Sequence, residues 1–271
     1  MDTLLVPPVA TTFEMIAALV SAALYLLVGI AVLARAPKDI RARLFFLTAL
    51  ASAPAYLVTV LLWARGSAST FTLPVIAVVG LSLMMGSLAL FHFTQVFPWR
   101  RPWIRRYSGW LSIGYAGIPV ALAIVVWAVG PLLQVLGQAP DTAPGGIAAV
   151  SAGLVEGLVL LIVAVPTLFV VGLVLPFAAL MSLYKTWHEA KATGADAARI
   201  TTFWILISQM AGGVLTILII PLLRLVAPTG PLVTMAAALL FAFGLLMPVA
   251  FAAGVWKYRV LELDPGDPAP G

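Results

Sequence analysis

Residues 231–260 read "PLVTMAAALLFAFGLLMPVAFAAGVWKYRV", and this stretch decides the fold class. No charged side chain interrupts it before Lys257, and Arg259 follows two residues later. An α-helix of about 20 apolar residues crosses the roughly 30 Å of hydrocarbon in a bilayer. The stretch therefore predicts a membrane-spanning helix that ends at a cationic boundary.

The composition extends this prediction to the whole chain. Of its 271 residues 63% are hydrophobic and 9% are charged, and the mean hydropathy is +1.12, whereas roughly a quarter of the residues in a soluble domain are charged. The apolar runs are too long for barrel strands, so only helices satisfy their backbone in lipid. We expect an all-α membrane protein, a seven-transmembrane-helix bundle. The predicted helices cover residues 13–34, 44–64, 71–97, 108–129, 157–184, 202–223 and 231–255 of one domain, 1–263, which a tail or linker, 264–271, follows.

The distribution of cations predicts the orientation of this bundle. Thirteen of the fifteen Lys and Arg residues lie in the connections after the first, third and fifth predicted helices or after the seventh, and only Arg65 and Arg224 lie on the other face. Cytoplasmic loops carry the excess of Lys and Arg. We therefore expect the N-terminus outside, the C-terminus in the cytoplasm and the formal charge of +5 to reflect topology.

Several classes of function are disfavoured by what the sequence lacks. There is no cysteine, so disulfides, iron–sulfur clusters and thiolate-ligated metals are excluded. No Asp, Glu, Lys or Arg lies in the middle of a predicted helix, where a proton pump or ion-coupled transporter needs one. His188 and Glu189 begin like the zinc motif H-E-x-x-H, but Ala192 occupies the position of its second histidine. We expect no enzyme, cofactor, metal or nucleic-acid partner.

One histidine lies near the predicted cytoplasmic boundary, in "LFHFTQVFPWRRPWIRR", residues 90–106. His92 and Gln95 are spaced i, i+3, so they share a helix face about one turn before Pro98. We interpret them as an interhelical polar pair. A haem ligand, a proton-sensing switch and a cytoplasmic gate are the alternatives.

Further candidate residues lie at the two predicted membrane surfaces. An outer-face rim is predicted from Glu14, Arg65, Glu156 and Arg224. Contacts with anionic lipid or with a coupled cytoplasmic protein are predicted for the basic residues of the other face. These are Arg100, Arg101, Arg105, Arg106, Lys257 and Arg259.

The connection before residue 202 predicts a tight cytoplasmic hairpin. Lys185 and Glu189 form an i, i+4 pair on a helix that continues beyond the membrane. Gly194 is a candidate for the end of that helix, and Asp196 is a candidate cap for the next one.

Small residues and prolines predict how the helices pack. The patterns Ser82-x-x-x-Gly86 and Ala49-x-x-x-Ala53 are typical of close helix packing. Prolines inside helices remove an intrahelical hydrogen bond and favour kinks. Such prolines are Pro54, Pro119, Pro166, Pro176 and Pro248.

Three short stretches carry a resemblance to a known family. "FHFTQVFP" at 91–98, "ATGADAARITTFWIL" at 192–206 and "VWKYRVLELD" at 255–264 resemble the seven-helix N-terminal sensor region of bacterial histidine kinases and related signalling proteins. The resemblance implies a receptor in the bacterial inner membrane that passes a helix movement to a cytoplasmic effector. Unlike that family, this chain has no kinase, phosphatase or cyclase sequence after Asp264. A separate partner, a longer chain or a non-signalling role each fit that departure.

Two functions follow as hypotheses. The first is a sensor that binds a small or apolar ligand between kinked helices and relays movement to another membrane or cytoplasmic protein. The second is a non-catalytic accessory subunit of a larger membrane complex, which the short loops and few charges favour.

Overall fold

The computed structural model describes residues 12–65, 72–101, 103–104, 109, 111–121, 123–124, 169–226 and 231–263. Every regular element in these ranges is helical, which confirms the all-α class. Helix α1 covers Thr12–Arg35, α2 Ile40–Arg65, α3 Thr72–Val96, α8 Leu175–Ala192, α9 Asp196–Val214, α10 Ile220–Val226 and α11 Pro231–Trp256. Two π-helical turns, η4 (Val170–Val174) and η5 (Leu215–Ile219), precede α8 and α10, and a 3-10 turn, η6 (Val260–Glu262), follows α11. A further helical stretch covers Leu111–Ala121.

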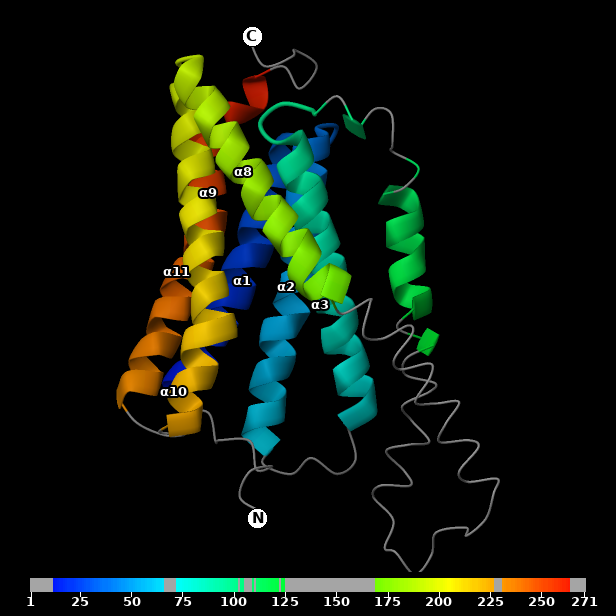
Figure 1. The fold of residues 1–271 in the computed structure, drawn as a ribbon, viewed down its shortest axis with the longest axis vertical. Helices are drawn as coiled ribbons and strands as arrows, with labels where there is room; N and C mark the ends of the chain where they lie inside the picture. The colour runs from blue at the N-terminus through cyan, green and yellow to red at the C-terminus, as the bar shows by residue number, and fades with distance from the viewer. Residues whose placement is uncertain are drawn as a thin grey trace, which may run out of the picture.

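Six long helices of the described ranges form a closed ring along the longest axis of the bundle (Figure 1). Helix α1 packs on α2, α2 on α3, α3 on α8, α8 on α9, α9 on α11, and α11 returns to α1. The α1–α2 connection, the end of α3, the α8–α9 connection and η6 all lie at one end of the bundle, the upper end in Figure 1. We call this the basic end, because it carries Lys38, Arg101, Lys191 and Lys257.

Two of the described helices are long and apolar enough to cross a membrane. They are Met15–Arg35, with a mean hydropathy of 2.6, and Thr234–Trp256, with a mean hydropathy of 2.2. Gly80–Val96 and Leu111–Ala121 are apolar but shorter. Many large apolar side chains on the outside of the ring are exposed, among them Leu27 of α1 at 64% and Phe177 of α8 at 62%.

The predicted bounds of α1, α3 and α11 lie within one residue of the observed ones, but other predicted bounds were wrong. Helix α8 ends at Ala192 and not at residue 184, α9 begins at Asp196 and not at 202, and α10 ends at Val226 and not at 223. Helix α2 begins at Ile40 and not at residue 44. Asp39 precedes it, and its Oδ1 accepts a hydrogen bond of 2.7 Å from the N–H of Arg41, as an N-cap side chain does. The apolar run therefore marks where the helix becomes apolar, and the cap marks where it starts.

The predicted hairpin forms between α8 and α9, with one correction. Gly194 adopts a φ of +69°, and Ala195 N–H donates to the carbonyl of Ala190 at 3.0 Å, as at a glycine-terminated helix end. Asp196 was wrongly predicted as a cap. It is the first residue of α9, and its carboxylate pairs instead with Arg199 at 2.9 Å.

The small-residue patterns do mark close helix packing. A Cβ added to Gly29 of α1 would lie 3.0 Å from Cβ of Ala49, and one added to Gly86 of α3 would lie 3.6 Å from Cβ of Ala51. At Gly254 of α11 an added Cβ would lie 2.7 Å from Cγ2 of Thr201 in α9. Gly29 and Gly254 let neighbouring backbones approach closely, whereas the contact at Gly86 is of ordinary van der Waals length.

Candidate functional site

A buried arginine organises the basic end. Arg41, in the first turn of α2, has a relative exposure of 0%. Its Nη2 lies 2.7 Å from Oδ2 of Asp39, and its Nε donates to both carboxylate oxygens of the same residue. A buried guanidinium is stable only when it is paired and its donors are bonded, and Asp39 supplies the pairing charge.

The remaining donors of Arg41 bind carbonyls from two distant segments. Nη1 donates to the carbonyl of Pro98, after α3, at 2.7 Å. It also donates to the carbonyls of Val260 at 3.3 Å and Leu263 at 3.0 Å, and Nη2 donates to that of Leu261 at 2.7 Å. All three guanidinium nitrogens therefore have acceptors. We call residues 260–263 the exit segment, because the chain leaves α11 through them.

An aromatic cluster joins the same three helices beside Arg41. Phe45 of α2 stacks on Phe251 of α11 with ring centroids 4.2 Å apart. Phe93 and Phe97, from the end of α3, meet Phe251 edge-on at 5.2 Å and 5.5 Å. All four side chains are buried. This cluster and Arg41 tie the last turns of α11 to α2 and α3.

A second ion pair joins the end of α3 to α8. Nη1 of Arg101 lies 2.8 Å from each carboxylate oxygen of Glu189, and its Nη2 donates to the hydroxyl of Thr186 at 2.8 Å. Trp99 Nε1 donates to the same carboxylate at 3.4 Å. The predicted partner of Glu189, Lys185, lies 4.0 Å away, and its side chain is 72% exposed. Arg101 is therefore the main partner of Glu189, and its donors are directed into the protein.

His92 and Gln95 both contact the segment that follows α3. Gln95 is buried, and its Oε1 accepts a hydrogen bond of 3.2 Å from Nε1 of Trp103. The Tyr115 hydroxyl lies 3.4 Å from Nδ1 of His92. This geometry suits packing between helices. Within the described residues no group of three or more His, Cys, Asp and Glu side chains is placed to hold a metal ion.

The other predicted surface residues are distributed as follows. Lys257 is exposed, with its Nζ 5.4 Å from the centre of the Tyr258 ring. Arg259 is exposed and adopts a φ of 53°, and its Nε lies 3.8 Å from Oε1 of Glu262. Nε of Arg100 is buried and has no hydrogen-bond partner among the described residues. Glu156, Arg105 and Arg106 lie outside the described residues, as do the side chains of Glu14, Arg65 and Arg224.

Helix α11 has a second set of polar contacts around Pro248. Proline has no N–H, so the carbonyl of Gly244, four residues earlier, lacks its helical donor. The hydroxyl of Tyr25 in α1 donates to this carbonyl at 2.9 Å. Ser208 of α9 donates to the preceding carbonyl, of Phe243, at 2.6 Å. The carbonyl that Pro248 leaves without a helical donor therefore accepts its bond from α1, and α9 bonds to the adjacent carbonyl.

Neither Arg41 nor Tyr25 was predicted from the sequence as a site residue. The N-cap Asp39 was a signal that α2 starts before its apolar run, but nothing in the sequence separates Arg41 from the other cations of that connection. The proline at 248 was visible, whereas its hydroxyl partner is more than 200 residues away. Comparisons of the chain with protein-family models, curated proteins and solved structures found no match.

Proposed function

We propose that the chain is a seven-helix membrane-embedded sensor that relays a helix movement through α11 to a cytoplasmic partner. The observation that carries this proposal is the buried Arg41. It binds the exit segment and the end of α3 at the same time, so α11 cannot move at this end without α2 and α3. The proposal assigns no reaction to the chain.

The membrane setting is supported by composition and by surface chemistry. Two helices have the length and hydropathy of spans, and exposed apolar side chains on α1, α8, α9 and α11 suit a lipid environment better than water. The concentration of cations at one end favours a cytoplasmic location for that end. We propose the bacterial inner membrane, with the remaining apolar helices also crossing it.

The topology can be tested with single cysteines, because the natural chain has none. Lys38→Cys lies at the basic end, and Val226→Cys lies at the end of α10, where the side chain is 87% exposed. A membrane-impermeant maleimide should label Val226→Cys in intact cells and Lys38→Cys only after permeabilisation. Equal labelling of both in intact cells would exclude the orientation.

The sensor function is tested by native mass spectrometry of the protein extracted gently from its own membrane. A defined small molecule bound to a single chain or homodimer is the expected result. A stoichiometric protein partner with no small molecule would favour the accessory subunit, or signalling through that separate partner, over a ligand-bound sensor. The partner would then identify the complex to which the chain belongs.

A further inference from the structure

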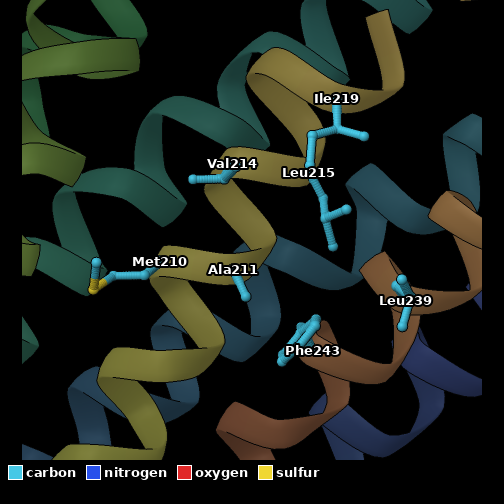
Figure 2. Close-up of a pocket in the computed structure, with 7 residues that line it drawn as sticks. All are labelled: Met210, Ala211, Val214, Leu215, Ile219, Leu239 and Phe243. Carbon is cyan, nitrogen blue, oxygen red and sulfur yellow. The ribbon is translucent and has the colours of Figure 1, made fainter. Parts of the chain in front are cut away.

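A groove of about 360 Å³ lies between the α9–η5 stretch and α11. In Figure 2, Ala211 and Leu215 point toward Leu239 and Phe243 of α11 across this groove, and Met210 and Val214 lie at its rim. All the described residues that line it are apolar. No hydrogen-bonding side chain among them is available to a ligand, so hydrocarbon is the ligand chemistry that this lining favours.

The groove coincides with an irregularity in the helix. At η5 the backbone changes from α-helical to π-helical hydrogen bonding, and Leu215 and Ile219, the first and last residues of that turn, both line the groove. A π-turn inserts a residue and displaces the row of side chains that would otherwise pack on the neighbouring helix, and such turns occur frequently at functional sites. This turn leaves the space beside α11 open.

The depth of the groove in the bilayer and its volume restrict which hydrocarbon can bind there. The part of α9 before residue 202 lies beyond the predicted span, so the groove residues Met210 and Ile219 lie eight and seventeen residues into that span, or roughly 12 and 26 Å at about 1.5 Å per residue. In a bilayer about 30 Å thick the groove therefore extends from near the middle into the half away from the basic end. Cavities of about 150 Å³ hold one benzene molecule, so 360 Å³ accommodates on the order of a dozen carbon atoms.

We propose that this groove binds one acyl chain of a phospholipid from the outer leaflet. A phospholipid already places a chain at this depth while its headgroup stays at the surface, and the rim residues Met210 and Val214 are exposed to that layer. The inference rests on the proposed membrane orientation, and it names the ligand class of the proposed sensor. The bound acyl chain would press on Phe243. The carbonyl of Phe243 accepts a hydrogen bond from Ser208, and the next carbonyl, of Gly244, accepts one from Tyr25.

Binding is tested by photo-crosslinking of the full chain in detergent. The probe is a phosphatidylethanolamine with a diazirine on one acyl chain, and unlabelled phosphatidylethanolamine is the competitor. We expect crosslinks on peptides covering 210–219 and 239–243 at least tenfold above those at the exposed Leu27, and we expect the competitor to remove them. Ala211→Trp, which fills the groove, should lose these crosslinks, and the matched surface variant Leu27→Trp should keep them.

A second variant and a second competitor keep the test decisive. Val214→Trp serves as the test if Ala211→Trp does not fold. Val214 is 49% exposed, so a tryptophan there covers the rim without entering the packed interior and should reduce labelling of the groove. The proposed binding site would be refuted if Leu27 were labelled as strongly as the groove peptides. It would also be refuted if labelling of the groove peptides persisted in both Ala211→Trp and Val214→Trp. Removal by palmitate and not by phosphatidylethanolamine would overturn the phospholipid in favour of a free fatty acid.

The helix movement of the proposed sensor is measured separately from lipid binding in the groove, so that each proposal can be refuted without the other. Spin labels at Lys185→Cys and Lys257→Cys report the distance between α8 and the end of α11, at two exposed positions. Addition of phosphatidylethanolamine should shift this distance in the otherwise natural chain and not in Ala211→Trp. Saturable crosslinking with an unchanged distance would support the groove and refute the sensor.

Discussion

Replacement of Arg41 by methionine should release the exit segment while it leaves the helices in place. Methionine is apolar and flexible enough to fill much of the space of the arginine side chain, but it donates no hydrogen bond. The carbonyls of Pro98 and Val260, whose bonds to Arg41 are buried, then lose their donor. Each buried acceptor without a partner costs about 1–3 kcal/mol.

The expected loss is therefore about 2–6 kcal/mol for the two buried carbonyls. The acceptors Leu261 and Leu263 are only partly buried, and water can replace the arginine there. We take about 3 kcal/mol as the loss in local stability, and since about 1.4 kcal/mol is a factor of ten, amide exchange should accelerate roughly 100-fold.

Hydrogen exchange measured by mass spectrometry checks this value on the peptide that covers residues 256–263. Its reporter amide is that of Glu262, which donates to the carbonyl of Arg259 at 2.9 Å. The matched control is Arg43→Met, because Arg43 is exposed and its Nε donates only to the neighbouring carbonyl of Pro37. The control should change exchange less than about threefold. If Arg41→Met left the peptide as protected as the natural chain, the arginine would not hold the exit segment.

Two further substitutions test the contacts of α11. Gly254→Ala places a Cβ 2.7 Å from Thr201 and should lower stability by about 1–3 kcal/mol through overpacking. In unfolding titrations with sodium dodecyl sulfate the control Gly213→Ala, whose added Cβ meets nothing within 4 Å, should be neutral or slightly stabilising. Tyr25→Phe leaves the carbonyl of Gly244 without its donor and should cost about 1 kcal/mol; an unchanged midpoint in the same titration would show that this bond is not needed.

Most of the helices could be predicted because each needs only local information. An apolar run long enough for a helix is visible without knowledge of its neighbours, and the observed ends of α1, α3 and α11 agree with those runs to within a residue or two. The start of α2 was missed because Arg41 and Arg43 were read as loop cations. The cap at Asp39 extends the helix through them.

The site was harder to predict because its contacts join distant segments. Arg41 and the carbonyl of Leu263 are separated by 222 residues, and nothing in either stretch specifies the other. A local rule paired Glu189 with Lys185, whereas the folded chain brings Arg101 closer from 88 residues away. Sequence spacing therefore identified which side chains were polar, and tertiary packing determined which of them met.

The two sets of contacts on α11 constrain how it can carry a signal. On one side of Pro248, Tyr25 and Ser208 bond to the helix backbone; on the other side, Phe251 and the exit segment are fixed to α2 and α3. A displacement at Phe243 could bend the helix at Pro248. About two turns after Phe243, the contacts of Phe251 with α2 and α3 would resist that bend. The basic end must then either move as one unit with α2 and α3 or break the bonds of Arg41. Because breaking them costs about 3 kcal/mol, the upper limit of the 1–3 kcal/mol typical of coupling between sites, we expect the concerted movement.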